Sequence, residues 1–192
     1  MFIGRPNAFP RKAQEAGNMM RGFNMVITTQ RGAERKASSE MFYLLKTIGD
    51  AEPAVKRTPV RGLLVARTSL DPVEAVTRLR LLVEEKPYEF HYVLRVIPVE
   101  RVVCTCLDEV KQAAAELASR MRADETFRVT VEKRFTSLHS REFIEAAASV
   151  FQQHVCLTRP DWILLIEVIG ESTGISLLRP DTILAVLKAK ML

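Results

Sequence analysis

The chain has 192 residues, of which 47% are hydrophobic and 27% charged, and its formal net charge is +5. These proportions are typical of a globular protein with a core, and they exclude a chain that is disordered throughout. The longest uninterrupted apolar runs, such as Trp162 to Ile166, have only the length of a strand. A bilayer-spanning helix needs about 20 apolar residues, so no membrane partner is predicted.

The positive charge lies mainly in the first half of the chain. Residues 1–103 hold 17 Lys and Arg against 11 Asp and Glu, whereas residues 124–192 hold 8 against 9. A net positive charge favours a polyanionic partner, and a basic patch in the second half must be local. Residues 1–22 contain Arg5, Arg11 and Lys12 but no apolar run, so they predict a flexible leading segment and not a secretory signal.

The chain has three cysteines, Cys104, Cys106 and Cys156. An odd number of cysteines without a secretory signal is unlike a disulfide scaffold, so they indicate a reducing, cytoplasmic location. Cys104-x-Cys106 and His154-x-Cys156 could together offer four zinc ligands. Structural zinc sites usually space paired cysteines by two to four residues, so this fit is poor. We predict small buried side chains at strand ends, and neither a metal nor a cofactor.

The first half alternates strand and helix patterns. They are a strand from Phe23 to Thr29, a helix from Ala33 to Ile48, a strand from Gly62 to Arg67, a helix between Asp71 and Pro87, and a strand from Glu89 to Val99. Asp71 can cap its helix and Pro72 suits the first turn. The segment from Glu52 to Pro59 is rich in proline and charge and is predicted to be a loop. Helices that cross over one face of a small sheet are expected from this order.

The second half contains a second unit of strands and helices. It comprises a helix from Asp108 to Met121, a half-buried strand from Phe127 to Val131, a helix from Arg141 to Gln152 capped by Ser140, a central strand from Trp162 to Ile169, a turn framed by Gly170 and Gly174, a strand from Ile175 to Leu178, and a last helix opened by Asp181.

No catalytic motif is present in the sequence. It lacks the phosphate loop Gly-x-x-x-x-Gly-Lys-Ser/Thr, the Gly-x-Gly-x-x-Gly turn and the Gly-x-Ser-x-Gly elbow. His91 and His154 fit packing roles. His139, beside a helix start and near Arg134, fits either a phosphate contact or a solvated turn. We predict a protein that is not an enzyme.

Anion recognition is the chemistry that the residues favour. Arg134, Arg141, Arg159 and Arg179 fall beside helix starts or strand turns, where guanidinium forks and free backbone N–H groups can hold phosphates. Each arginine alone also fits a solvated or salt-bridged surface position. Together they predict a phosphate-binding surface.

Several motifs resemble a known family. VTVEKR at 129–134, HSREFI at 139–144 and PDWILLIEVIGESTGISLL at 160–178 resemble a THUMP domain, an RNA-binding module of tRNA-modifying systems. FNMVITTQRGAERKASSEMFYLLKTIGD at 23–50 and FHYVLRVIPVERVVCTCLDEV at 90–110 are similar to the N-terminal half of the stand-alone THUMP adaptors of tRNA cytidine acetylation. The likeness covers nearly the whole chain beyond Gly22.

The resemblance implies an α+β fold, with a ferredoxin-like βαβαβ unit over residues 23–103 and a THUMP-type α/β unit over residues 104–192. It implies a non-catalytic adaptor that holds the acceptor-stem region of tRNA, not DNA, and presents it to a separate enzyme, a cytidine acetyltransferase. With its end at Leu192, the chain is expected to leave no room for a fused enzyme. Open alternatives are a protein-interaction or small-molecule sensor module, and an RNA-modifying enzyme with an unrecognised site.

The resemblance also implies which residues face RNA. In the second half these are Lys133, Arg134, Arg141 and Arg159, to which the pattern of cations at junctions adds His139 and Arg179. Because that half is not net basic, the first half is expected to share the RNA through four further cations: Arg31, Lys56, Arg57 and Arg61.

Overall fold

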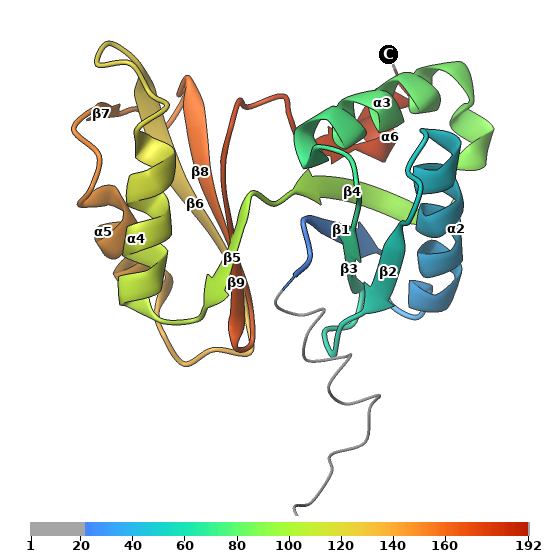
Figure 1. The fold of residues 1–192 in the computed structure, drawn as a ribbon, viewed down its shortest axis with the longest axis horizontal. Helices are drawn as coiled ribbons and strands as arrows, with labels where there is room; N and C mark the ends of the chain where they lie inside the picture. The colour runs from blue at the N-terminus through green and yellow to red at the C-terminus, as the bar shows by residue number, and fades with distance from the viewer. Residues whose placement is uncertain (1–21, 192) are drawn as a thin grey trace, which may run out of the picture.

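The computed structural model describes residues 22–191, and it consists of two five-stranded sheets that pack face to face with helices on their outer sides (Figure 1). The segment predicted to be flexible, residues 1–22, lies outside the described residues except for Gly22. The mixed α+β architecture, a ferredoxin-like unit followed by a THUMP-type unit, is confirmed.

The first sheet has the order β10-β4-β1-β3-β2, and all its neighbouring strands are antiparallel. Helices α2 and α3 cover its outer face (Figure 1). The elements of this unit are β1 (Met25–Thr29), α2 (Glu34–Thr47), β2 (Ala54–Arg57), β3 (Leu63–Arg67), α3 (Pro72–Glu85), the 3-10 turn η1 (Pro87–Glu89), β4 (Val93–Pro98), β10 (Leu184–Ala185) and α6 (Val186–Ala189).

The first unit begins as βαββαβ, with one strand more than the predicted βαβαβ. The additional strand is β2, which lies in the segment that proline and charge predicted to be a loop. β2 is an edge strand that pairs only with β3, and charged side chains are typical of such edges. The predicted start of α3 is confirmed, because the side chain of Asp71 accepts hydrogen bonds from the backbone N–H groups of Val73 and Glu74.

The second sheet has the order β5-β9-β8-β6-β7, with β6 parallel to β7 and β8 and the other pairs antiparallel. Helices α4 and α5 cover its outer face (Figure 1). The elements of this unit are β5 (Arg101–Cys104), α4 (Leu107–Ala118), β6 (Thr126–Arg134), α5 (Ser140–Ala148), β7 (His154–Val155), β8 (Trp162–Ile169) and β9 (Ser172–Leu178).

All three predicted helices of this half differ from the structure, beginning with α4, which ends at Ala118 before the predicted Met121. α5 begins at Ser140, with His139 and not Ser140 at the N-cap, and it ends at Ala148 before the predicted Gln152. Asp181 opens no helix, because the chain first adds β10 to the other sheet and forms only the short α6. Sheet pairing, which is long-range, decides both the position and the length of this terminal segment.

The inner faces of the two sheets share an apolar core. Its N-terminal side includes Val26, Val65 and Ile97, and its C-terminal side includes Ile163 and Leu165. The outer face of β8 meets the helices of its own unit through a different set of residues: Leu164, Ile166 and Val168. β8 is therefore apolar on both sides, as its sequence predicted, because it lies between two cores.

The chain crosses between the two units twice, once before β5 and once after β9, and both crossings lie at the same end of the second sheet. β5 spans the predicted boundary between residues 103 and 104, and it pairs with β9 of the second sheet. After β9 the chain returns to the first unit, where Leu184 pairs with Val96 and where Val186 is buried in the first core. A cut at the predicted boundary would therefore remove a strand from each sheet.

Gly174 lies inside β9 and not in the predicted turn, and it permits the close approach of the two units. A Cβ atom at this position would lie 3.0 Å from Val99 Cγ1 and 3.3 Å from Phe23 Cε2. Gly174→Val should therefore lower the free energy of unfolding by about 1–3 kcal/mol through overpacking, as measured by urea denaturation. Combining Gly174→Val with Val99→Ala should recover part of this loss, because it makes room for the new side chain. If Gly174→Val cost the same stability with valine and with alanine at position 99, the contact between positions 174 and 99 would be contradicted.

Candidate nucleic-acid interface

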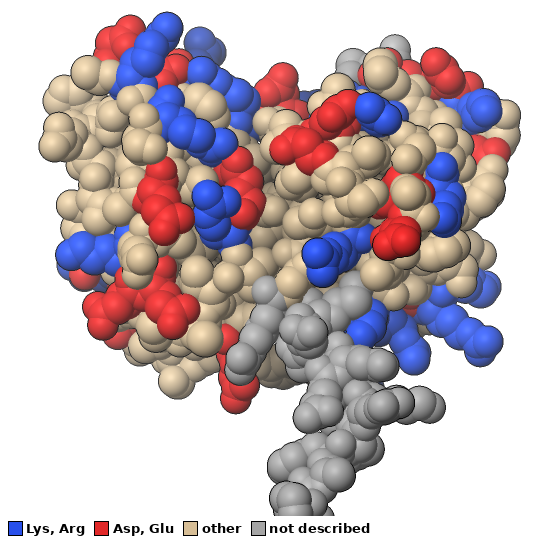
Figure 2. All heavy atoms as spheres, viewed as in Figure 1, with Lys and Arg blue, Asp and Glu red and all other residues tan. Residues whose placement is uncertain are grey.

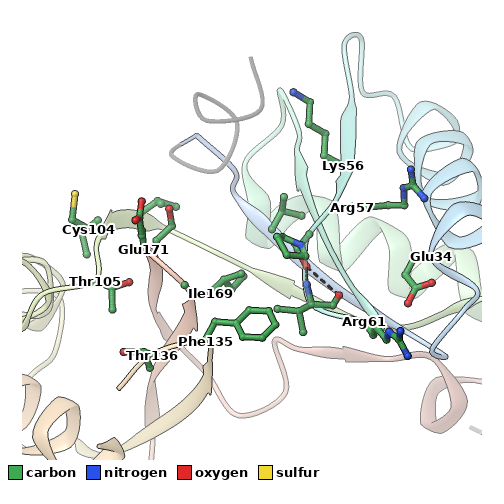
Figure 3. A pocket seen from close by; sticks show the side chains of 18 of the residues that line it. Glu34, Lys56, Arg57, Arg61, Cys104, Thr105, Phe135, Thr136, Ile169 and Glu171 are labelled. Atoms are coloured by element: carbon green, nitrogen blue, oxygen red, sulfur yellow. Dashed lines mark hydrogen bonds between the residues drawn. The ribbon is translucent and has the colours of Figure 1, made fainter. Parts of the chain in front are cut away.

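A cleft with a volume of about 1790 Å³ lies between the two units. The first unit contributes β2 and the turn at 58–61, and the second contributes the end of β5 and the turns at 135–138 and 170–171 (Figure 3). Three of the predicted cations, Lys56, Arg57 and Arg61, line it. The structure therefore places these charges beside a concave surface, whose depth the sequence could not show.

The turn that carries Arg61 is held by the carboxylate of Glu34. Oε1 of Glu34 accepts hydrogen bonds from the backbone N–H of Gly32 at 3.1 Å and of Gly62 at 2.7 Å. Hydrogen bonds from its own N–H and from these two glycines lower the pKa of Glu34, with a smaller contribution from the charge of Arg61. Gly62 has a φ of +78°, and a Cβ there would lie 2.9 Å from the carbonyl oxygen of Thr29. The turn therefore depends on glycine and on one carboxylate.

Three exposed arginines lie at or beside the cleft and are called the rim arginines below: Arg57 and Arg61 line it, and Arg31 lies next to the turn of Arg61. Arg31 packs beside Gly62, and Figure 3 shows Arg57 and Arg61 next to Glu34 at the start of α2. Within residues 22–191, the side chains of Arg31 and Arg57 form neither an ion pair nor a hydrogen bond. In Figure 2, Lys and Arg side chains gather below the lower ends of α2 and β2. The guanidinium groups of Arg31 and Arg57 are thus available to an anionic ligand.

The carboxylates near the cleft are largely engaged with backbone groups. Glu34 holds the two glycine N–H groups, and Oε2 of Glu109 accepts a hydrogen bond from the backbone N–H of Cys104 at 2.8 Å. Glu171 also lines the cleft. Two of these three acids are therefore parts of the scaffold, but they keep their negative charge, so the positive charge at the cleft is confined to its Arg and Lys side chains.

Phe135, which the sequence analysis did not single out, projects into the cleft from the turn after β6 (Figure 3). Phe135 is 71% exposed, and its φ of 57° is the one positive φ at a non-glycine residue in the described part of the chain. Such a conformation is disfavoured for a bulky residue and is found mainly where function or packing requires it. The sequence feature that could have pointed to Phe135 is its place directly after the basic pair Lys133-Arg134.

The predicted cations at the end of β6 have partners within the fold. Arg134 donates to the buried carboxylate of Glu167 at 2.8 Å, and it lies 3.5 Å from Glu132. Nζ of Lys133 donates to the carbonyl oxygen of Leu138 at 2.8 Å. These contacts hold the turn that carries Phe135, so the structure assigns a scaffold role to both cations whatever they do with RNA.

The start of α5 is exposed and lies at the same end of β6. Arg141 pairs with Glu145 at 2.6 Å, and hydrogen bonding to that carboxylate raises the pKa of Arg141. The backbone N–H of His139 donates to the side chain of Glu142 at 2.6 Å, which satisfies one free donor of the helix start.

Arg159 and Arg179 lie at the other end of the second sheet. Arg179 stacks over the ring of Trp162 at 3.8 Å and donates to Glu125 at 2.8 Å. Trp162 pairs with Phe127 at the start of β6, whereas Arg134 is at its end. At about 3.3 Å per residue the two ends are about 25 Å apart. The structure does not bring Arg159 and Arg179 to the same place as Arg134, so the single phosphate-binding surface predicted for the four C-terminal arginines is not present.

Glu125 explains why Arg179 is held in place. A hydrogen bond from the backbone N–H of Arg122, followed by contacts that include the guanidinium of Arg179, lowers the pKa of Glu125 to about 2. Glu125 is therefore ionised at neutral pH and binds Arg179. Arg159, by contrast, is exposed and has no side-chain partner within residues 22–191.

The cysteines do not occupy the predicted buried positions. Cys104 and Cys106 are exposed and Cys156 is partly buried. Cys104 pairs with Ser172 at one end of the second sheet, whereas His154 pairs with Thr126 at the other, so these residues cannot share one metal ion. Among residues 22–191 there is no group of three or more His, Cys, Asp or Glu arranged to hold a metal, and no helix long and apolar enough to cross a membrane.

Comparison with known proteins identifies the second unit. Residues 104–178 match the family model of the THUMP domain, which confirms this part of the resemblance. The match extends from the end of β5 to the end of β9 and so includes the turn with Phe135. A comparison with curated proteins found no match.

Several solved structures share the fold at low sequence identity. PH1313 from Pyrococcus horikoshii Ot3 is 20% identical, with a TM-score of 0.54 over 81% of this chain and 55% of that chain. TrmN from Thermus thermophilus is 16% identical, with a TM-score of 0.51 over 81% and 46%. A 4-thiouridine synthetase in complex with RNA and ATP is 18% identical, with a TM-score of 0.50 over 82% and 41%. The chain thus spans about half the length of these proteins.

Proposed function

We propose that this chain, whose residues 104–178 match the THUMP domain, binds tRNA without modifying it and presents it in the cytoplasm to a separate enzyme, a cytidine acetyltransferase. The observation that carries the proposal is the THUMP match, because this domain is an RNA-binding module of tRNA-modifying systems. The adaptor role and the acetyltransferase rest on the similarity of residues 23–50 and 90–110 to the stand-alone adaptors of that reaction.

The rim arginines supply the electrostatic part of the proposed interface. Guanidinium groups bind phosphates through paired N–H donors, and the side chains of Arg31 and Arg57 are not occupied by other described residues. Double-stranded RNA in the acceptor stem has A-form geometry, which proteins recognise mainly through phosphates and 2′-hydroxyls. The edge formed by β2, its following turn and the start of α2 therefore fits the backbone of RNA better than the edges of its bases.

A filter-binding titration of bulk tRNA at several salt concentrations tests the binding. The affinity should fall linearly on a logarithmic scale, with a slope of about −2 to −3 if three phosphates are contacted. A DNA duplex of the same length is the control and should bind more weakly, because it lacks 2′-hydroxyls and A-form geometry. Absence of tRNA binding at low salt, or an affinity independent of salt, would refute the proposal.

The adaptor role has its own test. Unmodified tRNA is incubated with the chain alone, with a cytidine acetyltransferase alone, and with both, and acetylated cytidine is measured by mass spectrometry. Product should appear efficiently only with both proteins. A modified nucleotide formed by the chain alone would instead make it an enzyme, and acetylation that is indifferent to the chain would exclude the adaptor role.

A further inference from the structure

The cleft combines one exposed aromatic ring with cations at its rim. Phe135 is the one aromatic residue among the described residues that line the cleft, and it is 71% exposed. The rim arginines Arg57 and Arg61 lie across the cleft, on the first unit (Figure 3). An exposed aromatic ring that faces arginines across a cleft suits a ligand that has both a flat apolar face and negative charge.

Internal packing does not explain the position of Phe135. Leu138, the other large apolar residue of its turn, packs against the core of the second unit, whereas Phe135 is not part of any apolar core. The turn is held at both ends. Nζ of Lys133 donates to the carbonyl oxygen of Leu138, and the backbone N–H of Gly170 donates to the carbonyl oxygen of Arg134 at 2.9 Å. The fold therefore holds a disfavoured backbone conformation and leaves the ring uncovered.

We propose that Phe135 stacks on an unpaired base of the bound RNA, while the rim arginines contact phosphates of the same strand. This inference rests on the proposed function and adds the class of RNA segment that the cleft accepts. Stacking on an aromatic ring tolerates any base, because every base has a flat face. Bases within a duplex are already stacked on each other, so the cleft selects a single-stranded segment next to a helical one. A protein ligand that inserted an apolar side chain would match the ring of Phe135, but it would leave the arginines across the cleft without a partner.

The test compares two RNA hairpins with the same stem, one with a single-stranded extension that contains the fluorescent base 2-aminopurine and one without an extension. The wild-type chain should bind the extended hairpin about tenfold more tightly or better, and binding should change the fluorescence of the extension. Phe135→Ala should lose both effects while it binds the blunt hairpin as the wild type does. Phe135→Trp should keep both, because indole also stacks.

The outcomes separate this inference from the proposed function. If neither hairpin binds to the wild-type chain, the proposed RNA binding itself fails. If both bind equally, or if Phe135→Ala retains the preference and the fluorescence change, RNA binding stands but the stacking role of Phe135 is wrong. Thermal unfolding of each variant checks that it is folded. The control variant Leu157→Ala alters another exposed apolar residue, outside the cleft, and should leave the preference for the extended hairpin unchanged.

Discussion

Replacing Arg57 and Arg61 together by glutamate should weaken the binding of tRNA by about 100-fold at 0.1 M salt. Each lost phosphate contact costs about tenfold under these conditions, and it should reduce the logarithmic salt slope by about 0.7–0.9. Both side chains are exposed at the rim of the cleft, and neither is buried against a core. The measurement is filter binding of tRNA between about 50 and 200 mM salt. The difference in affinity between the wild type and the variant should become smaller as the salt concentration increases.

The matched control reverses two arginines elsewhere. Arg122 lies just before β6 with its side chain exposed, and Arg159 lies just before β8 at the same end of the second sheet, away from the cleft. The variant Arg122→Glu/Arg159→Glu has the same net charge as the rim variant, so it separates position from total charge. Because screening limits such distant effects to about 10 Å at 0.1 M salt, we expect a change of less than about threefold. The reverse ranking of the two variants would move the interface to the end of the second sheet that lies away from the cleft.

Arg134→Ala should lower the free energy of unfolding by about 3–5 kcal/mol at neutral pH. The carboxylate of Glu167 is buried, and Arg134 is its ion-pair partner at 2.8 Å, while its Oε1 atom has no hydrogen-bond partner in the described part of the chain. Removing the guanidinium leaves a buried negative charge with only the more distant field of Arg95 to oppose it. Urea denaturation measures the loss.

The pH dependence of this variant has a definite sign. Burial raises the pKa of Glu167 above its ordinary 4.5, and Arg134 opposes that shift, so removing Arg134 raises the pKa further. The folded protein then binds a proton that the unfolded chain has released, and stability falls as pH rises from about 4.5 through the folded pKa. The cost of Arg134→Ala should therefore be smaller at about pH 5 than at about pH 8.

A second substitution tests the cause of this instability. Arg134→Ala/Glu167→Gln removes the stranded charge and should recover more than half of the lost stability, and it should remove the pH dependence. Since the resemblance implied an RNA contact for Arg134, tRNA binding should be measured on the same proteins. A variant as stable as the wild type but impaired in RNA binding would show that Arg134 serves the ligand and not the fold.

Local patterns in the sequence were sufficient for most elements of the structure. The capped start of α3 and the range of β8 depend on residues close together in the chain, and both agree with the structure. The THUMP match likewise follows from the motifs between residues 129 and 178. The edge strand β2 was missed because an edge needs few apolar residues, and its pairing with β3 is long-range information.

The sequence by itself determined the two α+β units, the THUMP domain and the basic character of the first half, because periodicity, capping residues and motifs are local properties. Only the tertiary structure decided which cations remain available to a ligand. Arg134 lies on β6, next to β8, and forms an ion pair with the buried carboxylate of Glu167 on that strand. Arg57, by contrast, stays exposed because it lies on the edge strand β2. The cleft and the place of Phe135 in it arise from the packing of two sheets, which no single segment of the chain encodes.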